Sequence, residues 1–341
     1  MSLKKCSIRD VSALSGVSIS TVSRILNNHE KAKTIPPEVH KRVQECARQL
    51  EYVPNANARR VFNHRAGIIG LLVPSYRQMK MHIFEDGHLR RLISGIEEGL
   101  GENKYRLLLI FNDEQFQENR EYMSMIRSQD IDGLLVWGAQ PDEQYWREPV
   151  EAGLPVVFAV TLPGKPEAPF NYVINATRES TRRALQLLLD HGHRHIMYLR
   201  ETGKARFLVE QMDLVVREME REQPELTLEW VDLGRKFEEL PVERFRQPQS
   251  PSAILSYNYS MAEEAISALE AAGHRVPDDL EVVSCYSFQS KKSNVTTIVV
   301  DDFEIGRLAA EAIQKLIEQP DYRVQFEVPA QLIQRQTTKA Q

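Results

Sequence analysis

Residues near the start of the chain could read the edges of DNA bases. They follow one another on the outer side of a short predicted helix: Ile19, Ser20, Thr21, Ser23 and Arg24. An isoleucine offers apolar contact to a thymine methyl group, while serine and threonine hydroxyls donate or accept hydrogen bonds. An arginine pairs bidentately with guanine or holds a phosphate. We therefore expect this helix to read a base sequence in the major groove.

Three predicted helices position these side chains. Ser7 and Asp10 have the form of a capping box at the start of the first helix, and Gly16 suits its left-handed end. Ser18 can cap the second helix, and Pro37 can begin the third, because proline is tolerated at the first helical position. The expected inward faces are Ile8, Val11 and Leu14; Val22, Ile25 and Leu26; and Val39, Val43, Ala47 and Leu50. This order is typical of a helix–turn–helix, and the alternative is a small three-helix bundle with a solvated polar face.

The charge of the chain is divided unevenly. The 341 residues carry a net charge of −5, but residues 1–65 hold twelve Lys and Arg against five Asp and Glu, a net of +7. Residues 66–341 therefore carry −12. This asymmetry indicates a small basic module for a polyanion, joined to an acidic body.

The motifs of the basic segment resemble the DNA-binding head of the lactose-repressor (LacI/GalR) family. They are Asp10-Val11, Ser15-Gly16-Val17-Ser18, Thr21-Val22-Ser23-Arg24, Asn27-Asn28, Tyr52-Val53-Pro54-Asn55 and Ala58-Arg59. The resemblance continues in register through nearly the whole chain. It implies that Ser18 and Asn27 join the outer residues of the second helix in contacting DNA.

The resemblance also implies a hinge helix at about residues 55–62 that becomes ordered on operator DNA. Asn55, Ala58 and Arg59 are its expected DNA contacts, and Val61 stands where the family has a leucine that wedges between base pairs. Valine is a shorter wedge and a poorer helix former than leucine. A second departure is the loop at residues 28–35, which looks two or three residues longer than is usual in the family.

From Gly67 onward, short apolar strands alternate with amphipathic helices, which favours parallel sheets with crossover helices. The expected strands are Ile68–Val73, Tyr105–Phe111, Gly133–Trp137, Pro155–Val160, His195–Leu199, Ala253–Ser256, Glu281–Cys285 and Thr296–Val300. The predicted fold class is α/β: a helix–turn–helix head (1–54), a hinge (55–66) and a two-lobed body like periplasmic binding proteins (67–341). The resemblance implies that lobe 1 covers about 67–162 and 297–324, and that lobe 2 covers about 163–296 and 325–341.

The family holds a small-molecule effector between its two lobes, and its contacts carry over unevenly to this chain. Arg206 and Asn258 match family residues, but the three expected aspartates are replaced by Val160, Tyr259 and either Tyr286 or Ser287. The loss of three carboxylates argues against an ordinary monosaccharide, whereas Arg206 favours an anionic group and aromatic residues offer stacking surface. The segment 75–88 looks about eight residues longer than the family's and is expected over the cleft. The candidate effector contacts are Ser75, Tyr76, Phe84, Trp137, Val160, Arg206, Asn258 and Tyr286.

Several other functions are not supported. Three cysteines without CxxC spacing fit reduced thiols, and no apolar run is long enough to span a membrane or to serve as a signal peptide, so we expect a soluble, cytoplasmic protein. The histidines at 191, 193 and 195 favour a structural role over a metal site, and Asp301-Asp302 and the helix Glu263–Glu270 favour solvated faces. No phosphate-binding loop, nucleophile elbow or zinc-helix motif occurs, so we expect neither an enzyme nor a cofactor.

The sequence thus predicts a homodimeric transcriptional regulator, more readily a repressor than an activator. Its expected partners are a palindromic double-stranded operator and a carbohydrate-related effector. One alternative is a DNA-binding regulator whose body only dimerises and has lost effector binding. Another is a small-molecule binding protein without a DNA function, which the basic head disfavours.

Overall fold

The structure is a computed structural model of the chain. It describes residues 6–27, 29–53, 65–75, 82–101, 105–139, 144–164, 170–201, 206–233, 240–288 and 293–340. Contacts divide the chain into two compact units, residues 1–68 with 125–132, and residues 69–124 with 133–341. None of the described helices is long and apolar enough to cross a membrane.

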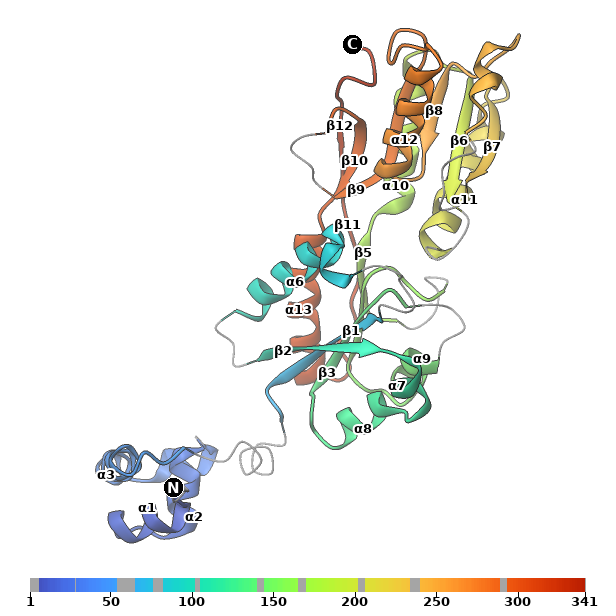
Figure 1. Ribbon diagram of the computed structural model, residues 1–341. Coiled ribbons are helices and arrows are strands. Elements are labelled where there is room, and N and C mark those ends of the chain that lie inside the picture. Colours follow the sequence, from blue (N-terminus) through green and yellow to red (C-terminus); the bar gives the residue numbers. More distant parts are fainter. Residues whose placement is uncertain are drawn as a thin grey trace. The chain divides into compact units, whose positions relative to one another are not determined.

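The first unit contains the predicted three-helix head, drawn in blue in Figure 1. Its helices are α1 (Ile8–Ser15), α2 (Ile19–Leu26) and α3 (Pro37–Gln49), with a short 3₁₀ helix η1 (Glu30–Thr34) before α3. Ser7 and Asp10 form the expected capping box, and Gly16 ends α1 at φ 68°. The core consists of Val11, Val22, Ile25, Val43 and Ala47.

One expected core residue of the head lies at the surface. Leu14 is 46% exposed, whereas Ser15 is 4% exposed. Val11 and Ser15 are four residues apart and therefore lie on the same helical face. The prediction that Leu14 faces inward is wrong, because the inner face of α1 passes through Ser15.

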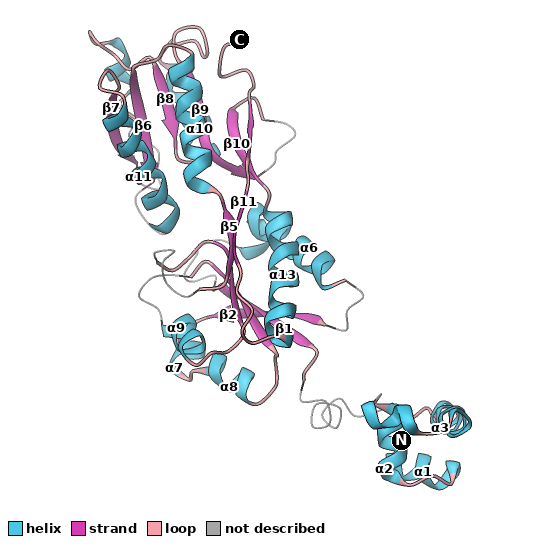
Figure 2. Ribbon diagram, turned by 180° about the vertical axis from the view of Figure 1, so that it is seen from behind, coloured by secondary structure: helices cyan, strands magenta, loops and turns pink. Residues whose placement is uncertain are grey.

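The second unit contains two six-stranded sheets, each with its own helices (Figures 1 and 2). The first sheet has the order β11-β5-β4-β3-β1-β2. Its strands are β1 (Ile68–Pro74), β2 (Arg106–Asn112), β3 (Gly133–Trp137), β4 (Val156–Val160), β5 (Tyr172–Asn175) and β11 (Gln325–Val328). Its helical elements are η2 (Ile83–Glu85), α6 (Gly87–Leu100), α7 (Glu114–Glu118), α8 (Glu121–Arg127), α9 (Gln144–Glu151) and α13 (Asp302–Glu318). We call this sheet with its helices lobe 1.

Lobe 2 is built on the second sheet, of order β12-β10-β9-β8-β6-β7. Its strands are β6 (His195–Glu201), β7 (Thr227–Leu233), β8 (Ala253–Ser256), β9 (Glu281–Phe288), β10 (Thr296–Val300) and β12 (Gln331–Ile333). Its helices are α10 (Thr177–Asp190), α11 (Arg206–Glu222), α12 (Tyr259–Ala271) and the 3₁₀ helix η3 (Val242–Arg246). Helices cover both faces of the sheet, with α12 in front in Figure 1 and α10 in front in Figure 2.

The chain passes between the lobes at points that differ from the expected boundaries. β5 and β11 belong to the lobe 1 sheet, and β10 belongs to the lobe 2 sheet. The passages therefore follow Asn175, Val300 and Val328, rather than residues 162, 296 and 324. A four-residue buried strand such as β5 has no periodicity that distinguishes it from a loop or a helical turn.

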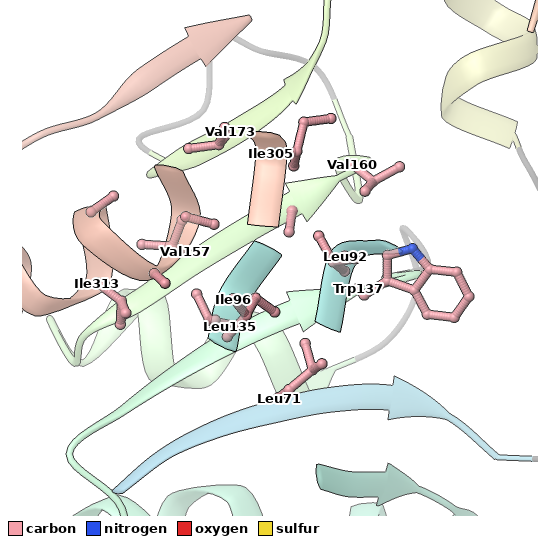
Figure 3. Packing of buried hydrophobic residues seen from close by; sticks show 14 of the residues in the cluster. Leu71, Leu92, Ile96, Leu135, Trp137, Val157, Val160, Val173, Ile305 and Ile313 are labelled. Atoms are coloured by element: carbon pink, nitrogen blue, oxygen red, sulfur yellow. The ribbon is translucent and has the colours of Figure 1, made fainter. Parts of the chain in front are cut away.

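The core of lobe 1 lies between the sheet and two helices from distant parts of the chain. Figure 3 shows Leu92 and Ile96 of α6 and Ile305 and Ile313 of α13 together with the strand residues, among them Leu135. The two helices approach closely through glycines. A Cβ at Gly95 would lie 1.9 Å from the Phe303 carbonyl oxygen, and one at Gly99 would lie 2.3 Å from that of Arg307. Only residues without a side chain fit at this crossing.

Candidate functional site: the outer face of α2 and the strand ends of the body

The N-terminus of α2 is fixed by its own side chains. The Ser18 hydroxyl accepts a hydrogen bond from the backbone N–H of Thr21 at 3.3 Å. It also lies 2.9 Å from the Thr21 hydroxyl and 3.1 Å from that of Ser20. This cap satisfies a backbone donor that would otherwise lack a partner at the helix start.

The outer face of α2 presents most of the residues that the sequence indicated. Ile19 is 45% exposed, and Ser18, Ser20 and Arg24 are also exposed, while Thr21 is half-buried. An exposed isoleucine beside hydroxyl groups and an arginine is a surface suited to base edges rather than to protein packing.

Ser23 and Asn27 do not belong to this outer face. Ser23 is 7% exposed and Asn27 is 6% exposed. The Asn27 side-chain amide donates to the Ser23 carbonyl at 2.9 Å and lies 3.2 Å from the Ser23 hydroxyl. The prediction that Ser23 lies on the outer face is wrong, because its position one turn before Asn27 turns both side chains into the head. In this conformation the pair supports the end of α2.

The long loop before α3 folds onto the head. The ring of His40 lies 2.9 Å from the Ala32 carbonyl oxygen, Ala32 is 4% exposed, and the Lys31 N–H donates to the His29 ring at 3.1 Å. Exposed basic side chains surround these elements in the described part of the head: Arg9, Arg24, Lys31, Lys33, Lys41, Arg42 and Arg48. Such charges can neutralise phosphates on either side of a groove. The expected hinge residues Asn55, Ala58, Arg59 and Val61 lie outside the described residues.

In lobe 1, three of the candidate effector contacts lie at the carboxyl ends of neighbouring strands. Ser75 follows β1, Trp137 ends β3 and Val160 ends β4, and these strands are parallel neighbours. Trp137 and Val160 are only 8% and 2% exposed, and Figure 3 shows them at the ends of their strands. Phe84 in η2 is 59% exposed, and Tyr76 lies outside the described residues.

The backbone at Val160 turns sharply. Its φ is 72°, and the Thr161 N–H donates to the Ala159 carbonyl at 2.9 Å across it. A bond from residue i+2 to residue i with a positive central φ defines a classic γ-turn, which is rare and strained. A β-branched residue at this φ is a genuine outlier.

In lobe 2, Asn258 and Tyr286 also lie near the carboxyl ends of neighbouring strands. Each follows by two residues a member of the pair Ser256 and Ser284, which are partners in the parallel strands β8 and β9. The Asn258 side-chain oxygen caps α12 by accepting from the Met261 N–H at 2.9 Å. Tyr259, where the resemblance led us to expect an aspartate, donates its phenol to Glu263 on the same helix. Arg206 begins α11, and its side chain lies outside the description.

Tyr286 stacks on a histidine from lobe 1 rather than standing open. Its ring lies 4.8 Å from that of His88 at 22°. Nδ1 of His88 lies 2.7 Å from an oxygen of Asp302 and 3.4 Å from the Tyr286 hydroxyl. Asp302 is 0% exposed, so the expectation that Asp301 and Asp302 form a solvated face is wrong for Asp302. Asp301 instead caps α13 by accepting from the Glu304 N–H at 3.2 Å.

Burial governs the ionisation of this cluster. Desolvation and the nearby Asp302 raise the pKa of Tyr286 well above its ordinary value, so its phenol stays neutral. Burial by itself lowers the pKa of His88, but the hydrogen bond and the negative charge of Asp302 raise it overall. Sequence reasoning did not find His88 or Asp302, because nothing in their local spacing indicates that they meet.

The histidines at 191, 193 and 195 take the structural role that the sequence favoured. His191 lies 2.7 Å from the buried carboxylate of Glu281, and Nδ1 of His193 lies 2.8 Å from the Ser252 hydroxyl. His195 lies 2.8 Å from Glu229. Each ring therefore joins neighbouring elements of lobe 2.

Comparison with known proteins gives matches to both parts of the chain. Residues 7–55 match the description "bacterial regulatory proteins, lacI family", and residues 185–338 match a periplasmic binding protein-like domain. The chain is 26% identical to the HTH-type transcriptional repressor PurR of Vibrio vulnificus (strain CMCP6), covering 97% of this chain and 98% of that protein.

Solved structures share the fold over nearly the full length. A lac repressor dimer bound to operator and the anti-inducer ONPF has a TM-score of 0.75 at 21% identity, covering 99% of this chain and 100% of that chain. A complex of the transcriptional regulator CelR with cellobiose has a TM-score of 0.66 at 22% identity, covering 97% of this chain and 99% of that chain. Both solved structures therefore share the order of this chain, a helix–turn–helix head followed by a two-lobed body.

Proposed function

The chain belongs to the lacI family of bacterial regulatory proteins, and we propose that it is a repressor that binds a palindromic operator as a homodimer in the cytoplasm. Membership places it among transcriptional regulators rather than enzymes. The observation that carries the proposal is the outer face of α2. There Ile19 and Arg24 are exposed on a helix that Ser18 caps and the head core supports.

The geometry of DNA supports a dimer as the binding form. A single recognition helix covers only one half-site, and two-fold related heads reach two half-sites about one helical turn apart. The open edge of lobe 1 offers a surface for a second copy, because β2 ends the sheet and exposes Leu108 (39%) and Phe111 (45%). Exposed apolar residues on an edge strand favour protein contact.

Selection of binding sites from random DNA, using the full chain, tests this proposal. We expect one enriched sequence with two inverted half-sites and a gel shift on it. The fragment 65–341, which lacks the head, serves as the control and should shift nothing. Enrichment of a single half-site without symmetry would contradict the dimer, and no enrichment would contradict the specific regulator.

For the body, we propose a carbohydrate-related effector that is not an ordinary monosaccharide. Ser75, Trp137 and Val160 lie at the carboxyl ends of neighbouring parallel strands. Ligands of parallel sheets generally bind at these ends, which supports a ligand at the lobe junction. The missing carboxylates disfavour a ligand that is recognised only through sugar hydroxyls. A thermal-shift panel of sugars, sugar phosphates, glycosides and nucleobases tests this, because a ligand of the native state raises its Tm.

The second candidate is a body that only dimerises and does not bind an effector. The contact of Tyr286 with His88 favours this candidate. Tyr286 stands where the family has an aspartate for the effector, and its ring packs against a side chain of the protein instead. Trp137 and Val160 are likewise buried in the core of lobe 1. A panel in which no compound raises Tm, while operator binding persists, would support this candidate over the first.

A further inference from the structure

We propose that His88, Asp302 and Tyr286 form a latch between the two lobes, which holds them together without a bound small molecule. His88 belongs to α6 of lobe 1 and Tyr286 to β9 of lobe 2, so their stacked rings join the lobes directly. The latch concerns the body alone. Only its effect on operator DNA rests on the proposed function.

The latch lies beside the points where the chain passes between the lobes. Asp302 begins α13 directly after the passage from β10. Asn175, at the end of β5, directly precedes the passage to α10. A contact close to these passages restrains the segments that must turn when lobes move, as hinge residues do in domain closure.

The groups of the latch are buried deeply enough to depend on one another. Asp302 is 0% exposed and Tyr286 is 9% exposed. Among the described residues, the second carboxylate oxygen of Asp302 has no hydrogen-bond partner. A buried carboxylate needs a compensating positive charge, and His88 lies nearest to supply it.

The charges around His88 set the direction of its pH dependence. Asp302 and Asp86 favour the protonated ring, whereas Arg91, which pairs with Asp301 at 3.3 Å, opposes it. On the lobe 2 side, His88 faces Tyr286, whose raised pKa keeps its phenol neutral, and Tyr257 lies near Tyr286. Because the pKa of His88 is raised in the folded chain, the contribution of its pair with Asp302, which lies within lobe 1 and holds the ring in place, is full below the ordinary histidine pKa. That contribution is lost as the pH rises through the raised value.

Hydrogen exchange of the full chain tests the latch. We compare the wild type with Tyr286→Ala, which removes the stacked ring, and Tyr286→Phe, which keeps it. Tyr198→Phe is the matched control, because Tyr198 is a buried tyrosine of the same sheet that contacts the ring of Trp230 edge to face. In Tyr286→Ala we expect several-fold faster exchange at the starts of α6 and α13, which lie in the other lobe. Tyr286→Phe and the control should leave these segments protected.

The pH arm uses His88→Gln and Asp302→Asn. In the wild type, protection of the two helix starts should fall as the pH rises from mildly acidic to mildly alkaline, after correction for intrinsic exchange. Both variants should lose this dependence. Unchanged protection in Tyr286→Ala, or the same pH dependence in His88→Gln as in the wild type, would overturn the latch. Gel shifts with these variants report operator binding separately. A failure of the proposed function can therefore be distinguished from a failure of the latch, which is measured by hydrogen exchange.

Discussion

Val160 combines a buried valine side chain with a backbone conformation that valine rarely adopts. The residue is 2% exposed and ends β4 at φ 72°, in a γ-turn closed by Ala159 and Thr161. Such strain costs on the order of 1–3 kcal/mol and persists only where the surroundings enforce it. Pairing of Val160 with Ile174 of β5 and burial in the core hold it in place.

Replacement by glycine measures this strain. Val157 lies within the same strand, is not among the residues with a positive φ and is 0% exposed, so Val157→Gly is the matched control. Both changes lose a buried side chain, but Val160→Gly also relieves the strained φ. We expect Val160→Gly to cost about 1–2 kcal/mol less than the control in urea unfolding. An equal or larger loss at Val160 would contradict the account.

Arg24 should carry part of the sequence specificity. Removing an arginine that pairs with guanine costs about 1–3 kcal/mol and relaxes one operator position. We expect Arg24→Ala to weaken binding and to lose its preference at that position in a second round of site selection. Arg48→Ala, which removes an exposed charge from α3, should weaken all sequences alike. If Arg24→Ala also weakens all sequences alike, Arg24 contacts phosphate only.

The sequence predicted the outer residues of α2 better than the partners of the latch. Ile19 and Arg24 follow from a helical period that begins at a capping serine, and the structure exposes both. Ser23 was misplaced because it lies at the boundary between the two faces of the helix. His88 and Asp302 are 214 residues apart, and no local pattern reports such a contact.

At the scale of elements, the crossing of α6 and α13 is the most demanding feature of lobe 1. A Cβ at Gly95 would meet backbone atoms of Phe303 at 1.9 and 2.7 Å, and one at Gly306 would meet the Leu92 carbonyl oxygen at 2.2 Å. Backbone atoms cannot move aside as the end of a flexible side chain can. The helices would have to separate to admit even a methyl group.

Gly95→Ala should therefore destabilise the chain. Helix propensity alone predicts a gain of about 1 kcal/mol for this change, whereas overpacking costs about 1–3 kcal/mol or more. We expect the second effect to win and the midpoint of urea unfolding to fall. Gly164→Ala is the control, since nothing lies within 4 Å of its Cβ position. A midpoint that rises in Gly95→Ala would show that the helices separate readily.

Most of the sheet could be predicted from apolar runs. The observed strands β3, β8 and β10 have the same bounds as the predicted strands Gly133–Trp137, Ala253–Ser256 and Thr296–Val300, because each is a continuous buried run. The prediction missed β5, β7, β11 and β12. In β7 only Leu228 and Leu233 are buried, and β11 and β12 are short strands with exposed residues, so none of the three forms a continuous apolar run. These are edge strands or short strands that neighbouring strands stabilise.

At the scale of the whole molecule, the division of charge predicts how salt affects DNA binding. The first 65 residues carry +7 although the chain as a whole carries −5. The logarithm of the binding constant should fall linearly with the logarithm of the salt concentration, with a slope of about −0.9 for each phosphate neutralised. Titration of an operator at several salt concentrations checks this, and affinity that is independent of salt would contradict it.

The topology of lobe 1 has a consequence for the synthesis of the protein. Its sheet needs β11, and its core needs α13, so it contains both the first strand of the body and residues up to 328. A ribosome releases the three-helix head early, but lobe 1 cannot be completed until almost the whole chain has emerged. The apolar strands of lobe 1 therefore stay uncovered until α13 has been synthesised. Translation that stops before residue 302 should yield a folded head on an unfinished body.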